Sequence, residues 1–259
     1  MPIREHAPNG SPCWADLWTS DVDGSRKFYA ELFGWVAEEP SPEFGGYFMW
    51  TRNGIPVAGG MGDMSEEMRA DDAWKIYLST DDIDNTAAEA AAAGAQVQSP
   101  AMAVADLGSQ IVLTDPTGAT LGAWQPGTFP GFTVLNEPGA PSWFELHTRD
   151  HAAAVAFYGS VFHCEAESVA DTDEFRYTML RGPSGEQLAG IIDASNFLPE
   201  GAPPCWTIYW QVEDVNAAVA AVQALGGSVV MAAEDTPYGR LATVADPAGA
   251  QFRLHTPNA

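Results

Sequence analysis

The sequence predicts an α+β protein made of two tandem, homologous domains, and this prediction rests on internal repetition. The stretch "SPCWADLWTSDVDGSRKFY" (residues 11–29) returns as "APSWFELHTRDHAAAVAFY" (140–158), with a Trp, an acidic residue, an Asp and a Phe-Tyr pair in step. Later in each copy, "DPTGAT" (115–120) is matched by "DPAGAQ" (246–251). Landmarks that recur at a steady interval of about 130 residues indicate duplicated domains.

A fainter repeat divides each copy in two. The opening stretch of the first copy is echoed by "DAWKIYLSTDDID" (72–84), and that of the second copy by "PCWTIYWQVEDVN" (204–216). Each of the four units begins with an extended aromatic run and then passes through an Asp into a helical pattern. We therefore expect two structural modules in each domain.

The elements of a module have local start and stop signals. Asp21 or Asp23 can cap the first helix, and Gly34 can end it. Short strand-like runs such as "YFMWT" and "QIVLT" follow the helices. Asp-Pro-x-Gly lies between two such runs, as in a hairpin turn. The predicted order is β-α-β-β-β, repeated four times.

Length and composition fit this organisation. At 259 residues the chain exceeds the usual size of a single domain, and 46% hydrophobic residues are enough to supply two cores. We expect domain 1 over residues 11–126, a Pro- and Gly-rich linker over 127–139, and domain 2 over 140–259.

Charge and composition exclude several classes of partner. Eleven Lys and Arg residues against thirty-five Asp and Glu residues give a formal charge of −24, which repels nucleic acid phosphates and anionic membranes. The sequence contains no apolar run of about 18 residues, so we expect no membrane span. The first ten residues lack the apolar run of a signal peptide, so we expect a cytoplasmic protein.

The sequence also lacks the motifs of several common binding and catalytic sites. Three cysteines are too few for a disulfide framework or a zinc site. Neither a phosphate-binding loop of the G-x-x-x-x-G-K-[ST] type nor a G-x-S-x-G nucleophile motif occurs in the chain. We expect no cofactor.

With an Asp and a Phe-Tyr pair at the first helix and D-P-x-G before the last strand, the chain resembles the vicinal oxygen chelate superfamily. This is the group of glyoxalases, bleomycin resistance proteins and extradiol dioxygenases, and the resemblance is greatest to its tandem actinobacterial members. It implies two glyoxalase-like domains, each built from two βαβββ modules that form cup-shaped half-barrels. It leaves function open, because the fold carries metalloenzymes, epimerases and drug-binding proteins.

Metal-dependent members of the superfamily hold the ion with a His or Gln on the first strand, a His on the strand that opens the second module, and a Glu on the last strand. Counting from the Asp landmarks places these positions at Trp14, Lys75 and Gly122 in domain 1 and at Trp143, Thr207 and Arg253 in domain 2. None of these is a normal metal ligand, since Trp offers no lone pair and Lys and Arg are cationic. The resemblance therefore implies a member without a metal; a displaced site at Asp16, Glu145 and His147 is the alternative.

Residues two apart on a strand share a face, so the neighbours of those positions predict the lining of each cup. For domain 1 the candidates are Trp14, Asp16, Trp18, Lys75, Tyr77 and Trp124; for domain 2 they are Trp143, Glu145, His147, Tyr209, Gln211, Arg253 and His255. The aromatic set suits stacking of a planar ligand. The more polar set offers acid–base groups at Glu145, His147 and His255, with an arginine for an anion.

Each of these interpretations has a structural alternative. A Trp that begins every module is typical of core packing. Asp16 with Lys75, and Glu145 with Arg253, can be internal ion pairs with no further role. His147 and His255 can be a hydrogen-bonded pair rather than acid–base groups.

Three functions follow from the sequence. The first is metal-independent binding of a small, planar, aromatic metabolite or antibiotic, as in resistance or secondary metabolism. The second is a metal-free lyase, isomerase or hydrolase that uses His147 or His255 in acid–base chemistry. The third is a protein-interaction role with relic pockets. We expect a small-molecule ligand and a monomer or weak homodimer.

Overall fold

The computed structural model describes residues 4–65 and 69–258 and confirms two glyoxalase-like α+β domains, each with two βαβββ modules. The first module of domain 1 contains β1 (Pro12–Trp18), α1 (Val22–Phe33), β2 (Val36–Ala37), the short 3₁₀ helix η1 (Pro42–Phe44), β3 (Phe48–Arg52) and β4 (Ile55–Met61). The second contains β5 (Ala73–Ser79), α2 (Ile83–Ala92), β6 (Gln96–Val97), β7 (Met102–Val104), β8 (Gly108–Thr114) and β9 (Thr120–Pro126).

Domain 2 repeats the same order. Its first module contains β10 (Pro141–Thr148), α3 (His151–Val161), β11 (Glu165–Asp171), β12 (Arg176–Arg181) and β13 (Gln187–Asp193). Its second contains β14 (Cys205–Gln211), α4 (Val215–Ala224), β15 (Ser228–Thr236), β16 (Gly239–Ala245) and β17 (Gln251–Thr256).

Each domain forms one curved sheet, in which the first strands of its two modules are central and antiparallel. The order is β2-β3-β4-β1-β5-β9-β8-β6 in domain 1, with β7 on β8, and β11-β12-β13-β10-β14-β17-β16-β15 in domain 2. The last strand of each module runs parallel to the first, as β4 does beside β1 and β17 beside β14. The concave faces are called here the domain 1 cup and the domain 2 cup.

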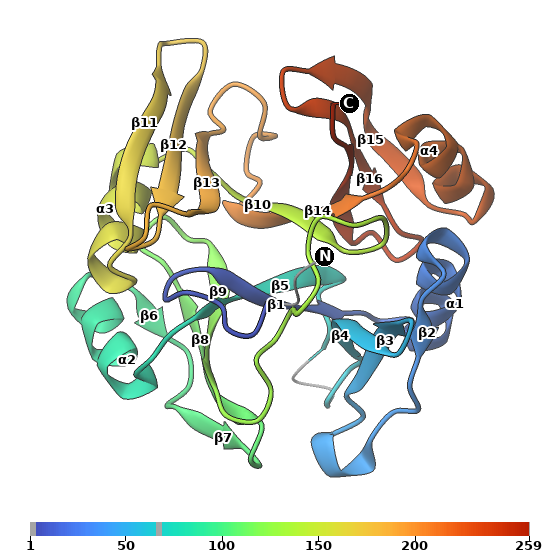
Figure 1. Ribbon diagram of the computed structural model, residues 1–259, viewed down its shortest axis with the longest axis horizontal. Coiled ribbons are helices and arrows are strands. Elements are labelled where there is room, and N and C mark those ends of the chain that lie inside the picture. The colour runs from blue at the N-terminus through green and yellow to red at the C-terminus, as the bar shows by residue number, and fades with distance from the viewer. Residues whose placement is uncertain (1–3, 66–68, 259) are drawn as a thin grey trace.

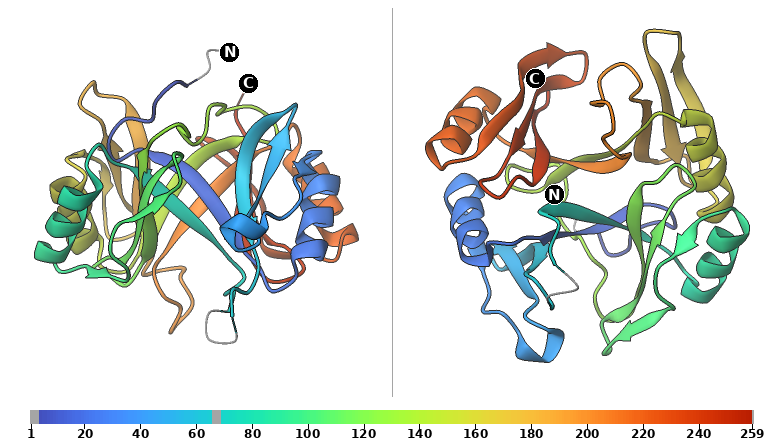
Figure 2. Two further views of the ribbon diagram at one scale, coloured as in Figure 1. Left: turned by 90° about the horizontal axis from the view of Figure 1, so that it is seen from below. Right: turned by 180° about the vertical axis from the view of Figure 1, so that it is seen from behind.

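The two sheets lie back to back, with the cups opening in opposite directions (Figure 1). Strand β14 of domain 2 packs across β5 and β9 of domain 1. The helices pair across the domain boundary, α2 with α3 on one side and α1 with α4 on the other, and both further views show this pairing (Figure 2).

Large aromatic side chains fill the space between the two sheets. Trp210 of β14 lies 4.8 Å from Trp35 and 5.3 Å from Trp74, measured between ring centroids. The Trp35 indole donates a hydrogen bond of 2.9 Å to the carbonyl of Gly139 in the linker. Because these side chains are fully or nearly buried, the domain interface is a hydrophobic core rather than a loose contact.

The predicted helix caps are present, and Asp21 rather than Asp23 caps α1. Its carboxylate accepts a hydrogen bond from the backbone N–H of Gly24, and Asp82, Asp150 and Asp214 cap the other three helices in the same way. Gly34 ends α1 in the left-handed conformation with φ 69°.

The D-P-x-G turns do more than connect strands. Asp115 bonds the backbone N–H groups of its own turn and also accepts a hydrogen bond of 2.8 Å from the Tyr158 hydroxyl of α3 in the other domain. Asp246 likewise accepts a hydrogen bond of 3.1 Å from Tyr29 of α1. We call these two Tyr–Asp contacts the interdomain clasps. The repeated motifs therefore recognise each other across the domain boundary.

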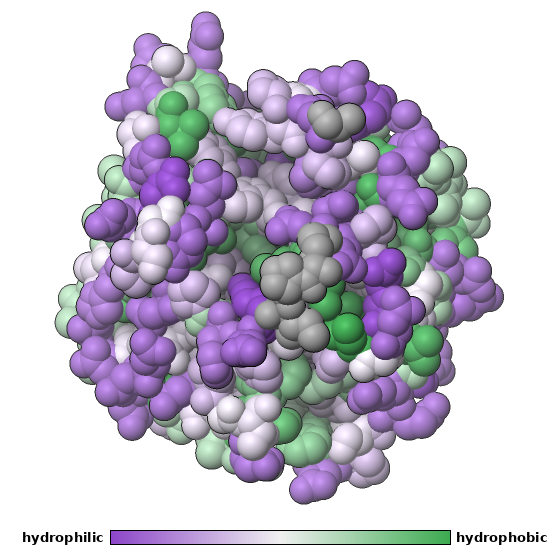
Figure 3. Space-filling view, viewed as in Figure 1, coloured by the Kyte–Doolittle hydropathy of each residue, from purple (hydrophilic) through white to green (hydrophobic). Residues whose placement is uncertain are grey.

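The face of the molecule seen in Figure 1 is mostly hydrophilic. Hydrophilic residues cover most of the face seen in the space-filling view, and the hydrophobic ones lie in small groups (Figure 3). None of the helices within residues 4–65 and 69–258 is long and apolar enough to cross a membrane.

Candidate functional site

The floor of the domain 1 cup is a carboxylate held by two tyrosines. Asp16 is buried on β1 and accepts a hydrogen bond of 2.7 Å from the Tyr47 hydroxyl and a second bond from Tyr77. The Trp14 indole donates in turn to the Tyr47 oxygen at 2.9 Å. The backbones of Asp16 and Lys75 are paired, but the Lys75 ammonium bonds Asp71 instead.

The linker closes the domain 1 cup with aromatic rings. Phe129 packs edge-on against Trp14 at 4.8 Å, and its carbonyl accepts the Trp124 indole N–H at 3.0 Å. Phe132 packs against Trp14 from the linker as well, at 5.0 Å. These contacts use the indole faces that the sequence suggested for ligand stacking, so the chain itself occupies that position.

Burial makes Asp16 an unusual carboxyl group. Burial raises its pKa from 3.8 to about 6, against the lowering effect of the hydrogen bonds from Tyr47, Tyr77 and Trp14. The folded state therefore favours the protonated acid. The stability that depends on this group is fully present below pH 3.8 and is lost as the pH rises through about 6.

We expect Asp16→Asn to remove this pH dependence. Between pH 4 and pH 8 the wild type should lose about 2.4 kcal/mol of unfolding free energy relative to the variant, since one pKa unit corresponds to about 1.4 kcal/mol and a small part of the effect is already lost at pH 4. Urea unfolding at a series of pH values measures the difference. Asp81→Asn, at an exposed position, is the control. If the difference in unfolding free energy between wild type and variant does not change across this pH range, the raised pKa of Asp16 is contradicted.

The floor of the domain 2 cup is a carboxylate held by an arginine, a histidine and a tyrosine. Glu145 Oε1 accepts hydrogen bonds from His147 Nε2 at 2.8 Å and from the Tyr209 hydroxyl at 2.8 Å, and Arg253 Nη1 lies 3.4 Å away. The Arg253 guanidinium also stacks over the Tyr209 ring at 5.1 Å. The predicted Glu145–Arg253 pair is thus present, within a larger network.

This network keeps Glu145 ionised. Burial alone would raise its pKa, but the hydrogen bond and charge of His147, the charge of Arg253 and the Tyr209 hydroxyl together hold the pKa below its usual value of 4.5. The guanidinium keeps further donors, because Nε is buried without a partner and no described residue accepts a hydrogen bond from Nη2. The charges on the floor are therefore balanced while a donor remains for a ligand oxygen.

Exposed aromatic side chains surround the domain 2 cup. Phe175 stacks on Tyr177 at 5.8 Å, and Phe197 packs edge-on against His147 at 5.3 Å. Tyr238, whose carbonyl contacts His255, lies on the β15–β16 turn. The three are 41%, 39% and 63% exposed, so much of each aromatic side chain is accessible to solvent. We call Phe175, Phe197 and Tyr238 the aromatic rim.

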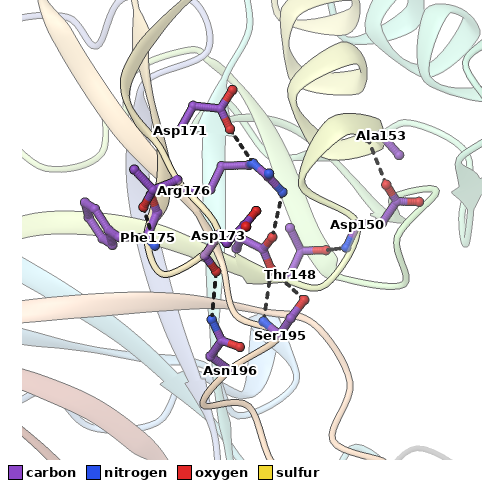
Figure 4. Close-up of polar contacts among 11 residues, drawn as sticks. Thr148, Asp150, Ala153, Asp171, Asp173, Phe175, Arg176, Ser195 and Asn196 are labelled. Atoms are coloured by element: carbon purple, nitrogen blue, oxygen red, sulfur yellow. Dashed lines mark hydrogen bonds and ion pairs between the residues drawn. The ribbon is translucent and has the colours of Figure 1, made fainter.

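Polar contacts behind the cup wall hold part of this rim in place. Arg176 bridges Asp171 at 2.7 Å and Asp193 at 3.1 Å, while the neighbouring Phe175 ring turns to the other side of the strand (Figure 4). Asp193 also accepts a hydrogen bond of 2.6 Å from Ser195, just before Phe197. Asp171, Arg176 and Asp193 border an open groove of about 650 Å³ beside α3. Because Arg176 is already paired with the two carboxylates there, we interpret it as a support of the cup wall.

The loop that carries Phe197 is also held by hydrogen bonds from Arg149. Arg149 donates hydrogen bonds to the carbonyls of Ala202, Leu198 and Pro199 at 2.7, 3.0 and 2.6 Å. One guanidinium therefore binds three backbone acceptors along residues 198–202. The loop is held against the end of β10, next to His147.

The remaining predicted site residues lie apart from this network. His255 is fixed by Ser142 Oγ at 2.8 Å and by the Tyr238 carbonyl at 3.0 Å, so both its ring nitrogens are engaged. Within residues 4–65 and 69–258, no hydrogen bond or ion pair joins His255 to His147 or Glu145. Gln211, beside His255 in the sheet, is half-buried at the end of β14. Trp18 ends β1 with its indole N–H buried and unpartnered. Trp143, the counterpart of Trp14, is only half-buried and donates to Tyr177 at 3.0 Å.

Sequence reasoning missed the two tyrosines that complete the floors. Tyr47 and Tyr177 come from the wall strands or their ends, and each hydroxyl lies over a glycine of the adjacent strand. A Cβ on Gly59 would lie 1.9 Å from the Tyr47 hydroxyl, and one on Gly190 would lie 1.8 Å from that of Tyr177. The signal was a Tyr before or in the third strand of each first module, followed by a Gly in the fourth strand.

Fold, repeat and site define a tandem cup protein of the glyoxalase type, and comparison with known families agrees. Residues 14–122 match the family model of the glyoxalase-like domain. Residues 141–254 match that of the glyoxalase/bleomycin resistance protein/dioxygenase superfamily. The chain belongs to this superfamily.

Two relatives match over nearly the whole chain. A Mycobacterium tuberculosis protein, CFP32, which carries a provisional glyoxylase name, is 36% identical over 270 residues, covering 99% of this chain and 98% of its own. The anthracycline biosynthesis protein DnrV of Streptomyces peucetius is 33% identical over 263 residues, covering 95% and 92%. Both relatives therefore share the complete two-domain organisation.

Solved structures share the fold at low identity. The Mn(II)-bound glyoxalase from Novosphingobium aromaticivorans aligns with a TM-score of 0.64 at 17% identity, covering 95% of this chain and 82% of that one. The 2,3-dioxygenase LapB from Pseudomonas sp. KL28 aligns with a TM-score of 0.63 at 15% identity, covering 98% and 94%. At this identity the likeness extends to the fold alone.

The side chains at the family's metal positions do not fit an ion. In domain 1 a Cβ on Gly122 would lie 2.1 Å from the Tyr77 ring, so no ligand side chain can be placed there without moving Tyr77. In domain 2 the position of the carboxylate ligand holds the Arg253 guanidinium, paired with Glu145. Among the described residues, no three His, Cys, Asp or Glu side chains gather as a metal site. The alternative metal site at Asp16, Glu145 and His147 does not form either, because Asp16 lies in the domain 1 cup and Glu145 in the domain 2 cup.

Proposed function

We propose that this protein binds a small, planar, aromatic metabolite or antibiotic in the domain 2 cup without a metal ion. The observation that carries the proposal is the contrast between the cups. The domain 1 cup is closed by Phe129 and Phe132, whereas the domain 2 cup combines a half-buried Trp143, a free guanidinium donor on Arg253 and the aromatic rim. A flat ring system with one acceptor oxygen is complementary to that combination.

The relatives support the same class of ligand. DnrV is named for anthracycline biosynthesis, and anthracyclines contain a flat polycyclic ring system with several oxygens. The rim residues come from three separate segments, so a ligand with more than one fused ring could contact more than one of them. We infer that a polycyclic ligand stacks between the rim and Trp143, with an oxygen on Arg253.

We expect alizarin, a three-ring hydroxyanthraquinone, to quench tryptophan fluorescence on binding, with phenol binding more weakly. Phe197→Ala should weaken alizarin about tenfold, because one lost aromatic contact is worth about 1.4 kcal/mol. Met102→Ala, at a 54% exposed hydrophobic residue of domain 1, is the matched control and should leave affinity unchanged. Titration in excess chelator should give the same affinity.

Other results would favour other functions. A flat fluorescence response to alizarin, 2-naphthol and phenol would favour the protein-interaction role. Affinity that disappears with chelator and returns with a divalent ion would contradict metal independence. An equal loss in Phe197→Ala and Met102→Ala would place the ligand outside the domain 2 cup.

A further inference from the structure

His147 and Glu145 form a carboxylate–imidazole dyad in the domain 2 cup. The 2.8 Å hydrogen bond to Glu145, an ionised carboxylate that can only accept, requires the proton on His147 Nε2. When the ring is neutral, its lone pair is then on Nδ1. Nδ1 has no hydrogen-bond partner among the described residues. It is also not fully buried.

The surroundings hold this ring in one orientation. Phe197 packs edge-on against it at 5.3 Å, and the loop carrying Phe197 is fastened by Arg149. His147 is itself buried, so only a small part of the ring faces the cup. A base oriented by a carboxylate and restrained by packing is the arrangement that general base catalysis needs.

An electrophilic group lies on the same carboxylate. Arg253 Nη1 and His147 Nε2 both contact Glu145 Oε1, at 3.4 and 2.8 Å, so one oxygen separates the guanidinium from the imidazole. The unused Arg253 Nη2 is a donor for an oxygen that gains negative charge. The imidazole and the guanidinium are thus joined to the same carboxylate oxygen.

The geometry points to a second activity that rests on the proposed binding function: His147 catalyses proton transfer at the carbon next to a carbonyl of the bound aromatic ligand. Nδ1 takes the proton, the C–H electron pair forms the C=C bond of the enolate, and the carbonyl π pair moves to the oxygen held by Arg253. Glu145 stabilises the imidazolium. The proton then returns from Nδ1 to the oxygen, which gives the enol isomer, or to the same carbon, which gives only exchange of that hydrogen with the solvent. Neither outcome needs an oxidant or a metal.

The choice of histidine follows from hydrogen bonding. His255 has both nitrogens engaged, by Ser142 and by the Tyr238 carbonyl, and so has no lone pair directed at a ligand. Glu145 itself is a poor base, because three donors lower its pKa. His147 is the group of the predicted acid–base set that keeps an open nitrogen.

The test is hydrogen–deuterium exchange of 2-tetralone, a bicyclic enolisable ketone, followed by NMR in D₂O at concentrations that quench tryptophan fluorescence. We expect the protein to accelerate exchange next to the carbonyl and His147→Gln to reduce the acceleration at least a hundredfold with little change in binding. His163→Gln, an exposed domain 2 histidine, is the control and should exchange as the wild type.

A second readout does not depend on turnover. Nitrogen-15 NMR of the wild type should show His147 as the Nε2–H tautomer, and Glu145→Gln should give a mixture of tautomers with slower exchange. Bound 2-tetralone that exchanges at the buffer rate, or a His147 ring protonated on Nδ1 alone, overturns the proton-transfer role and leaves the binding proposal intact. Failure of both 2-tetralone and alizarin to bind overturns the proposed function itself.

Discussion

Asp115→Ala is expected to lower the free energy of unfolding by about 3–5 kcal/mol, one of the largest effects available to a single polar residue in this chain. Its carboxylate accepts hydrogen bonds from the Thr117 N–H and hydroxyl, each at 2.8 Å, from the Ala119 N–H at 3.0 Å, and from Tyr158 at 2.8 Å. Alanine leaves these buried donors without a partner, and an unpaired buried donor costs more than an average hydrogen bond is worth.

The clasp can be separated from the turn. Tyr158→Phe leaves the turn intact but removes the interdomain bond to Asp115 and the bond from the Trp206 indole within domain 2. It should cost about 1–3 kcal/mol, because Trp206 and Asp115 are each left short of one buried partner. Denaturant unfolding measures both variants. Asp81→Ala, at an exposed acidic residue, should stay within about 0.5 kcal/mol of the wild type. If Tyr158→Phe behaves like Asp81→Ala, the clasp does not stabilise the interface.

The clasps explain why the motifs repeat. In the sequence, D-P-x-G indicated a hairpin turn, and the structure has that turn between β8 and β9 and between β16 and β17. The structure adds that Tyr29 meets Asp246 and Tyr158 meets Asp115, so each motif is completed by the other domain. A contact between segments so far apart in sequence leaves no local pattern in either of them.

The fold was predictable because its signals are local and repeated four times. Caps, strand alternation and turns depend on residues a few positions apart, and repetition confirms each assignment. The pairing of charges was less predictable. Asp16 lies opposite Lys75 in the sheet, yet Asp71, four residues earlier on the chain, takes the ammonium. Strand pairing constrains backbones, whereas a flexible lysine selects among all carboxylates within reach.

The difference between the cups was predictable only in part. The aromatic and polar linings follow from strand alternation, and their contrast was visible in the sequence. The closing of the domain 1 cup was not, because Phe129 and Phe132 lie in a linker without periodicity. Tyr47 and Tyr177 were missed because their hydroxyls cross to neighbouring strands whose register the sequence does not fix.

The opposite pKa directions of the two floors follow from their partners. Asp16 has hydroxyl donors and no cation, so burial prevails and its pKa rises to about 6. Glu145 has an arginine and a histidine beside it, so attraction prevails over burial and its pKa falls. One duplicated position therefore carries an acid that tends to hold its proton in domain 1 and a carboxylate that releases it in domain 2.

Arg253→Met should destabilise the protein by about 3–5 kcal/mol at neutral pH, since removing one member of a buried ion pair leaves the other charge uncompensated. Glu145 keeps its bonds from His147 and Tyr209 but loses the cation. The double variant Glu145→Gln/Arg253→Met should lose less than the sum of the single variants, and this coupling is what a double-mutant cycle by denaturant unfolding measures. Alizarin affinity should fall in both variants that lack the guanidinium.

The control for this cycle is the exposed pair of Arg181 and Glu167 on the β11–β12 hairpin, where Arg181→Met should cost about 1 kcal/mol or less.

The effect of Arg253→Met also has a definite pH dependence. Because the folded pKa of Glu145 is lowered, its stabilising contribution is present above the usual value of 4.5 and is lost as the pH falls through the folded pKa. The cost of Arg253→Met should therefore shrink in acid, opposite in direction to the Asp16 effect. A cost that stays the same from neutral pH into acid would mean that Glu145 is protonated in the folded protein at neutral pH. The balanced floor proposed for ligand binding would then be wrong.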